Sequence, residues 1–260
     1  MTSSQPREQR LVFGEVAERY DRARPSYPRE LVGDVAEILG LPERARVLEV
    51  GTGTGKATPL WADAGYEVVC LEPSEGMAAI ARRNFSERGN VTIETTDFED
   101  WELESEGFDL VTAAQAWHWV PEDVGLPKAH DALRPGGGVA LFWNWERERP
   151  TNIDVVFDEV YQRFAPDLVK EPLKQRVGEV IRERLAESPL FGDVVVRRYP
   201  WEKLYTAATY VDLLGTHSDH RMLPNDARTR LHDGVAEVID GLGGTVTIGY
   251  TTGVLIAPRA

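Results

Sequence analysis

The chain has 260 residues, of which 42% are hydrophobic, and this is enough to bury the core of one sizeable domain. Its net charge of −14 repels phosphate backbones and disfavours a DNA or RNA substrate. The opening residues lack the apolar core of a signal peptide, and no apolar run reaches membrane-spanning length. Cys70 is the only cysteine, which excludes an intrachain disulfide and a cysteine-rich metal site. We therefore expect a cytoplasmic protein without nucleic-acid or membrane partners.

The first predicted elements are two helices joined by an irregular segment. Apolar spacing predicts a short amphipathic helix from Leu11 to Arg22. Residues 20–28, YDRARPSYP, combine two prolines with two tyrosines and two arginines, which indicates an ordered segment without regular structure. Pro28 suits the first position of a helix, which we expect to continue to Leu39.

The stretch that organises the chain is residues 45–57, ARVLEVGTGTGKA. Its apolar part, residues 46–50, predicts a buried parallel strand, and residues 56–64 have the spacing of a helix. Three glycines lie between these elements, at Gly51, Gly53 and Gly55. Such a turn lets a ligand approach bare backbone, and the helix N-terminus offers N–H donors to an anion.

The spacing of the glycines separates three families of ligand. The dinucleotide fingerprint requires a glycine where this chain has Lys56, and the P-loop requires other residues at Val50 and Ala57. The remaining pattern, Glu-x-Gly-x-Gly-x-Gly from Glu49, resembles motif I of the class I S-adenosylmethionine-dependent methyltransferases. This resemblance implies that the loop binds S-adenosylmethionine through Glu49, Gly51, Thr52 and Gly53.

A second buried strand is predicted over residues 67–72, and it ends in an acid about 20 residues after Gly51. A carboxylate at the end of a second strand can accept hydrogen bonds from both ribose hydroxyls of a nucleoside, which favours Glu72 in this role. A helix follows, with Ser74 as its N-cap. Two residues of this turn and helix are further candidates for the cofactor site, although the second could equally pack in the core: Pro73 and Met77.

A third strand is predicted from Val91 to Thr96, and two candidate residues follow at its tip. The family resemblance implies that Asp97 accepts the adenine amino group and that Phe98 packs on the ring. It also implies that the N-terminal segment lies over the cofactor, which makes Tyr20, and to a lesser degree Arg24, a cofactor or substrate contact.

A fourth strand is predicted from Phe108 to Ala114, and the segment QAWHWVP follows it. Loops at the carboxyl ends of parallel strands form the ligand crevice of open α/β sheets. The segment resembles motif IV of small-molecule methyltransferases, which implies that the backbone of Ala114 and Gln115 anchors the amino group of the cofactor. His118 is a candidate general base for an acceptor hydroxyl or amine; it could equally fix the loop or pack beside the tryptophans.

Four tryptophans follow two neighbouring strands. A helix over 124–133 and a turn at 134–138 precede the fifth strand, 139–143, and Leu-Arg-Pro-Gly-Gly before an apolar strand is another resemblance to the same family. The indoles could line a pocket for a flat acceptor and attract a sulfonium, or they could attach the loops to the core. We expect two of the four to line the pocket, among Trp117, Trp119, Trp143 and Trp145.

Beyond residue 146 the alternation of strand and helix stops. Two helices, 152–164 and 172–187, predict a helical cap over the crevice. His217 and His220 lack further spaced ligands, so no metal site is expected, and they are predicted to reach into the cap cavity. Further substrate contacts are predicted at Tyr27 and Arg221. The remaining elements are a strand over 194–204, a helix over 207–214, a polar loop over 216–221, a helix over 225–242 and a strand over 245–257.

Together these features predict an α/β protein with a doubly wound, Rossmann-like sheet. The family resemblance implies seven strands, mostly parallel, with one antiparallel strand. We expect a cofactor-binding core over 1–145, a helical cap over 146–192, and the last two strands over 193–260. The predicted function is methyl transfer from S-adenosylmethionine to O, N or C of a small-molecule acceptor, leaving S-adenosylhomocysteine. The alternatives are a non-catalytic S-adenosylmethionine sensor and a nucleotide-dependent oxidoreductase. Neither the acceptor nor the choice between monomer and homodimer follows from the sequence.

Overall fold

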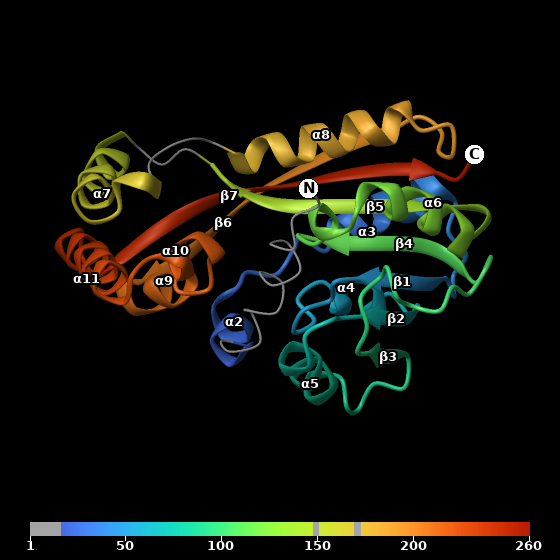
Figure 1. Ribbon diagram of the computed structural model, residues 1–260, viewed down its shortest axis with the longest axis horizontal. Helices are drawn as coiled ribbons and strands as arrows, with labels where there is room; N and C mark the ends of the chain where they lie inside the picture. Colours follow the sequence, from blue (N-terminus) through green and yellow to red (C-terminus); the bar gives the residue numbers. More distant parts are fainter. Residues whose placement is uncertain (1–16, 148–150, 169–172) are drawn as a thin grey trace.

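The computed structural model describes residues 17–147, 151–168 and 173–260 of the chain (Figure 1). A twisted sheet runs through the molecule, with helices on both of its faces. The predicted helix from Leu11 to Arg22 begins outside the described residues, and its described part is α2 (Ala17–Ala23). No helix in these described ranges has both the length and the apolar content that crossing a membrane requires.

The sheet has seven strands in the order β3-β2-β1-β4-β5-β7-β6. β7 runs antiparallel to both neighbours, whereas the other pairs are parallel. The predicted sheet with one reversed strand is thereby confirmed. The strands are β1 (Arg46–Val50), β2 (Glu67–Leu71), β3 (Val91–Glu94), β4 (Phe108–Ala114), β5 (Leu133–Glu146), β6 (Val195–Thr206) and β7 (Thr245–Pro258).

Each face of the sheet has its own core, because successive side chains of a strand point to opposite faces. Val47 of β1 packs with α3 and α4, whereas its neighbour Leu48 packs with α6 and α8. A fifth helix, α5, follows β2 and contacts β3 and α2. The bounds are α3 (Glu30–Leu39), α4 (Thr58–Asp63), α5 (Glu75–Asn84), α6 (Glu122–Ala132) and α8 (Leu173–Glu187).

Local sequence explains the buried face and the C-terminal end of α3. Leu31, Val35 and Leu39 recur every four residues and form the buried stripe of α3. The helix ends at Gly40, which adopts a left-handed conformation (φ 63°) and donates its N–H to the Ala36 carbonyl. Ser74 occupies the predicted N-cap position of α5, but its side chain makes no capping hydrogen bond.

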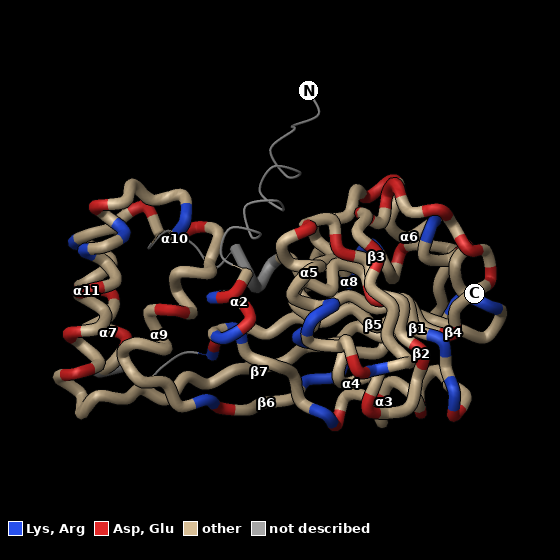
Figure 2. Tube along the Cα trace, turned by 90° about the horizontal axis from the view of Figure 1, so that it is seen from below, with Lys and Arg blue, Asp and Glu red and all other residues tan. Residues whose placement is uncertain are grey.

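A second lobe is built from helices packed against the far ends of β6 and β7 (Figure 2). It consists of α7 (Thr151–Phe164), η3 (Pro166–Leu168), α9 (Ala207–Leu214), α10 (Ser218–Met222) and α11 (Asn225–Gly241). Its core packs Phe157, Tyr210 and Leu231 from three of these helices against Val246 and Ile248 of β7. Helix α2 lies between this lobe and the sheet, where it contacts α9 and α5.

The residues predicted to form one helical cap divide between two cores. Helix α7 packs against α11 in the second lobe. Helix α8 returns to the sheet, where Ile181 and Leu185 share a core with Leu141 and Leu255. The apolar stripe of each helix therefore faces a different layer, a distinction that helical spacing alone does not carry. Pro172, the predicted first residue of the second helix, lies outside the described residues.

Two other predictions differ from the structure. The polar loop predicted over 216–221 is wrong, because residues 218–222 form the short helix α10. The fifth strand begins at Leu133 instead of residue 139, since Leu133 pairs with Phe108 before a shift in register brings Gly138 opposite Leu110. The turn-forming residues are thus an irregularity inside β5.

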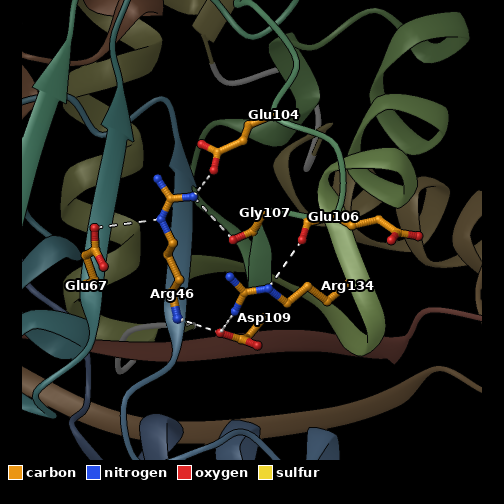
Figure 3. Close-up of polar contacts among 7 residues, drawn as sticks. All are labelled: Arg46, Glu67, Glu104, Glu106, Gly107, Asp109 and Arg134. Carbon is orange, nitrogen blue, oxygen red and sulfur yellow. Dashed lines mark hydrogen bonds and ion pairs between the residues drawn. The ribbon is translucent and has the colours of Figure 1, made fainter.

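A polar network connects the strands at the end of the sheet where β1 and β2 begin (Figure 3). The Arg46 backbone N–H donates to Asp109 Oδ2 over 2.7 Å, and the Arg46 guanidinium donates to Glu104 and lies 3.7 Å from Glu67. Arg134 donates to the same Asp109 oxygen over 3.0 Å. These contacts connect β1, β2 and β4 at their N-terminal ends, opposite the cavity.

Candidate active site

A cavity of about 530 Å³ lies between the carboxyl ends of the parallel strands and the second lobe. Its volume is within the range of pockets for small molecules and cofactors. Most of the predicted site residues line it, although they come from distant parts of the chain: Tyr20, Gly51, Gly53, Glu72, Pro73, Met77, Asp97, Phe98, Ala114, Gln115, His118, Trp119, Trp143, Trp145 and His217.

The glycine loop folds back onto the end of β2. The N–H groups of Gly51 and Thr52 both donate to the Leu71 carbonyl, over 2.9 and 3.1 Å. Gly51 has a φ of 69°, a conformation that side chains other than glycine rarely adopt. A Cβ at Gly51 would lie 2.5 Å from the Cβ of Ala116. The absence of a side chain therefore lets the segment after β4 close against the loop.

We expect Gly51→Ala to lower both the stability of the protein and its affinity for the ligand of the loop. The added methyl group collides with Ala116 and requires a strained backbone, which together cost about 1–3 kcal/mol. Thermal unfolding and calorimetric titration with S-adenosylmethionine measure the two effects. Gly33→Ala is the matched control, because a Cβ there meets nothing within 4 Å and alanine favours the helix α3. Equal stability of the two variants would contradict the prediction.

Glu72 follows β2 and holds its carboxylate on the cavity wall. One oxygen accepts from the Gly53 N–H over 2.8 Å, and the other accepts from the Ser74 N–H over 2.9 Å. The side chain is 6% exposed, and this burial raises its pKa although the two N–H groups oppose the shift. Each oxygen keeps a second lone pair, so the fixed carboxylate can accept hydrogen bonds from two neighbouring hydroxyls.

The wall around Glu72 combines one acid with apolar side chains. Asp97 is buried, and its Oδ1 accepts from the Asp100 N–H over 2.9 Å. Phe98 packs against Trp101 with ring centroids 6.4 Å apart. Met77 packs in a small core with Tyr20, as one alternative expected, and it also lines the cavity, so its contact with the cofactor stays a prediction.

Gln115 occupies a strained position directly after β4. Its φ is 59°, which is uncommon for a residue other than glycine. Two bonds to β5 hold it there: the backbone N–H donates to the Phe142 carbonyl over 2.9 Å, and the side-chain amide donates to the Asn144 carbonyl over 3.0 Å. Such strain persists only where surrounding contacts determine the geometry, and it is frequent at functional sites.

Three of the four predicted tryptophans line the cavity, one more than expected. Trp143 and Trp145 stack with ring centroids 6.2 Å apart. Trp119 packs against the His118 ring at 4.8 Å. Trp117 instead turns into the core beside Phe98, where it is 5% exposed.

The contact with Trp143 determines which tautomer a neutral His118 ring adopts. The indole Nε1–H donates to His118 Nδ1 over 3.3 Å. An indole nitrogen is a donor only, so Nδ1 carries the lone pair and Nε2 of the neutral ring carries the proton. A neutral ring in this tautomer is a hydrogen-bond donor at Nε2, which argues against the predicted role of His118 as a base.

Glu49 is a predicted cofactor residue that lies outside the cavity lining. It is 1% exposed and pairs in register with Cys70, whose Sγ–H donates to it over 3.8 Å. Cys70 belongs to the core on the α3 and α4 face, which places the Glu49 carboxyl beneath the loop. Burial raises its pKa to about 7, against hydrogen bonds from Thr58, Thr52 and Cys70.

Three further predicted residues also lie outside the cavity lining. Thr52 in the loop shares a hydrogen bond of 2.9 Å with Thr58, the first residue of α4. Tyr27 packs edge-on against Phe142 at 5.0 Å on the α3 and α4 face, and burial raises its pKa. Arg221 is on α10 and does not reach the cavity wall.

Sequence reasoning did not single out the tyrosines that line the cavity from the second lobe and from β7. Tyr161, Tyr210 and Tyr250 line the cavity from α7, α9 and β7. Their positions fit the apolar stripes of these elements, so the spacing indicated only core packing. A tyrosine hydroxyl within such a stripe was the available signal, because a buried hydroxyl usually has a partner. His220 was predicted to reach into this space, and it lines the cavity.

Comparison with known proteins agrees with this geometry. A methyltransferase domain model matches residues 47–137. An uncharacterised methyltransferase of Mycobacterium bovis is 31% identical over 240 residues, which cover 92% of this chain and 89% of that relative. Trans-aconitate 2-methyltransferase of Variovorax paradoxus is 30% identical over 207 residues, which cover 78% and 71%. A solved structure of a protein proposed to be a type II methyltransferase from Anaeromyxobacter dehalogenans has a TM-score of 0.66 and 24% identity, covering 90% and 97%.

The fold and the glycine loop define a methyltransferase with a Rossmann-like sheet. The chain belongs to the class I S-adenosylmethionine-dependent methyltransferases, as the resemblance of motif I implied. Its cofactor is S-adenosylmethionine. The oxidoreductase alternative is therefore set aside.

Proposed function

We propose that this enzyme transfers the methyl group of S-adenosylmethionine to a small-molecule acceptor held between the strand ends and the second lobe. The observation that carries this proposal is the continuity of the cavity. It begins at Glu72 and Asp97, passes the indoles, and reaches Tyr161 and His220 in the second lobe. A donor at the strand ends would therefore share one chamber with an acceptor beneath the helices.

The residues at the strand ends fit the donor. Glu72 would accept the two ribose hydroxyls, and Asp97 would accept the adenine amino group beside the ring of Phe98. A Cβ at Gly53 would contact Met77 and Tyr20 at 3.5 and 3.8 Å, so the glycine backbone lies on the cavity wall between these two side chains. The loop and the backbone at Gln115 would hold the methionyl part. When bound, S-adenosylmethionine supplies an electrophilic methyl group on a sulfonium sulfur.

The rest of the chamber suits the positioning of a small acceptor. Most of the benefit in such a reaction comes from orienting the acceptor and excluding water. The stacked rings of Trp143 and Trp145 provide an apolar, electron-rich wall for both purposes. The helices of the second lobe would form the roof and select the acceptor. The relative that methylates trans-aconitate supports an acceptor of this size.

A labelled-donor screen tests the proposal. The full chain is incubated with metabolite extract and S-adenosylmethionine carrying a labelled methyl group, and the products are identified by mass. We expect one or a few small molecules to gain the label. Calorimetric binding of the donor without any labelled product, across extracts from several sources, would instead support a sensor of S-adenosylmethionine.

We expect His118→Ala to lower turnover about tenfold, which corresponds to the loss of one hydrogen-bond donor. The affinity for S-adenosylmethionine and the shape of the pH–rate profile are expected to change little, because Nε2 of the ring already carries a proton. Steady-state kinetics with the acceptor from the screen provides both measurements. A fall of more than about 100-fold with loss of one limb of the profile would restore His118 as the base.

A further inference from the structure

Three side chains from three helices form a hydrogen-bonded chain that leads away from the cavity. The hydroxyl of Tyr161 on α7 lies 3.1 Å from Nε2 of His220 on α10. Nδ1 of the same ring lies 3.1 Å from Nε2 of His232 on α11. Tyr161 and His220 line the cavity, whereas His232 does not line it and is partly exposed. The chain therefore joins the acceptor end of the chamber to the outer helix of the lobe.

The two bonds of His220 fix how protons are arranged along this chain. A neutral imidazole donates through one nitrogen and accepts through the other. If the Tyr161 hydroxyl donates to Nε2, the proton of His220 is on Nδ1 and is donated to His232. If His232 donates instead, His220 donates to the Tyr161 oxygen. A shift of one proton along each bond of the first arrangement leaves a phenolate at Tyr161 and a cation at His232, so the bonded groups can relay a proton that the Tyr161 oxygen takes up.

The surroundings keep the outer end of the chain neutral. Burial, Arg228 on α11 and Arg19 on α2 lower the pKa of His232, against the opposing charge of Asp233. The inner ring is faced by Tyr161 and by residues in and directly before α10. The ring centroid of His217, the N-cap residue of α10, lies 5.9 Å from that of His220, and Asp219 accepts the His220 backbone N–H. At neutral pH His232 can therefore accept a proton and pass it to water.

We propose that Tyr161 is the general base of this enzyme, that His220 and His232 carry the proton away, and that the acceptor is a hydroxyl or amine compound. The inference rests on the proposed function and names its substrate class. A carboxylate acceptor has no proton to lose and gains nothing from such a chain. His118 does not compete for this role, because Trp143 occupies its lone pair.

The proton balance is complete without a further reactant. The acceptor O or N forms a bond to the methyl carbon while the carbon–sulfur bond breaks and its electron pair stays on sulfur. The acceptor loses its proton to the Tyr161 oxygen, and Tyr161 passes its own proton to Nε2 of His220. His220 releases the Nδ1 proton to Nε2 of His232. His232 leaves the step as a cation and discharges to solvent.

The hydrogen bonds between Tyr161, His220 and His232 can be tested without turnover by NMR of the full protein labelled with ¹⁵N-histidine. The protein has five histidines, so single substitutions assign every ring. We expect Tyr161→Phe to move the ring shifts of both His220 and His232 and to change the pKa of His232 by about half a unit, the value of one hydrogen bond. His130→Gln, on α6, is the control and should move neither. Unchanged rings in Tyr161→Phe would overturn the proposal.

Kinetics with matched probes tests the substrate class. The probes are 2-phenylethylamine, 4-ethylphenol, and the carboxylates 3-phenylpropionate and trans-aconitate, each with labelled donor. We expect the label on the amine or the phenol, and Tyr161→Phe to lower that rate about 100-fold or more. His232→Gln should abolish the rise in rate with pH near the pKa of His232. Label on a carboxylate alone, or equal rates for Tyr161→Phe, would overturn the proposal.

Donor binding separates this proposal from the proposed function. We expect S-adenosylmethionine to bind the unmodified protein and Tyr161→Phe with affinities within about twofold, because the tyrosine is at the acceptor end of the cavity. If the donor binds but Tyr161→Phe leaves the ring shifts of His220 and His232 unchanged, the proposed proton transfer is overturned and the methyltransferase function stands. If the ring shifts change but the donor does not bind, the proposed function itself is overturned.

Discussion

Glu72→Ala is expected to weaken the binding of S-adenosylmethionine by about 100-fold or more. Hydrogen bonds to a charged group contribute about 1.5–3 kcal/mol each, and the carboxylate is placed to accept two from the ribose. The backbone donors at Gly53 and Ser74 hold it in that position before the donor binds. Little reorganisation is therefore needed on binding, so the loss reflects the missing acceptors.

Titration calorimetry of the full chain measures this effect. Glu67→Ala is the matched control, because Glu67 begins the same strand at the opposite end and is exposed. Glu72→Gln is a second variant that keeps the size of the side chain and removes its charge, and we expect an intermediate loss. Thermal unfolding checks that each variant folds. A folded Glu72→Ala protein with unchanged affinity would remove Glu72 from the ribose site.

Glu49→Gln is expected to make the protein more stable above neutral pH. Burial raises the pKa of Glu49 from 4.5 to about 7. A group with a raised pKa binds its proton more tightly in the folded state, so its contribution to stability is complete below pH 4.5 and is lost as the pH rises to 7. Each unit corresponds to about 1.4 kcal/mol, so this loss amounts to roughly 3 kcal/mol. Glutamine has the shape of the protonated acid and carries no such dependence.

Urea unfolding between pH 5 and 8 measures the free energy of unfolding of Glu49→Gln and of the unmodified protein. We expect the difference between them to grow with pH, whereas Glu43→Gln at an exposed site should follow the unmodified protein. The variant Glu49→Gln also tests the predicted cofactor role of Glu49. Because the Glu49 carboxyl lies outside the cavity lining, we expect the affinity of this variant for S-adenosylmethionine to stay within about twofold of that of the unmodified protein. A parallel pH dependence in both proteins would contradict the assignment of the raised pKa.

The first half of the sheet could be predicted because its signals are local. Short apolar runs marked β1, β2 and β4, and the glycine spacing identified the turn after β1. Residues directly after parallel strands meet at one edge of the sheet, so chain order alone brought Glu72, Asp97 and Gln115 to one cavity. The motif resemblance then supplied the cofactor.

The second lobe resisted prediction because its signals are not local. The spacing of apolar residues in α7 and α8 shows that each helix buries one face, but not that one packs in the lobe and the other on the sheet. The same limit applies to the indoles, since Trp117 and Trp119 are two residues apart and only the second lines the cavity. The direction in which a loop side chain points depends on its contacts with residues that are distant in the sequence.

By itself the sequence determined the class of the protein, the donor and the strand-end residues expected to bind it, because a strand, a glycine turn and a terminal acid form one continuous local pattern. Only the tertiary structure decided that Tyr161, at the acceptor end of the cavity, is joined through His220 to His232 on the outer helix. Tyr161, His220 and His232 are on three helices separated by long stretches of chain, and they meet because the lobe packs its apolar faces together. Contacts of this kind depend on how faces pack, which no spacing along the chain encodes.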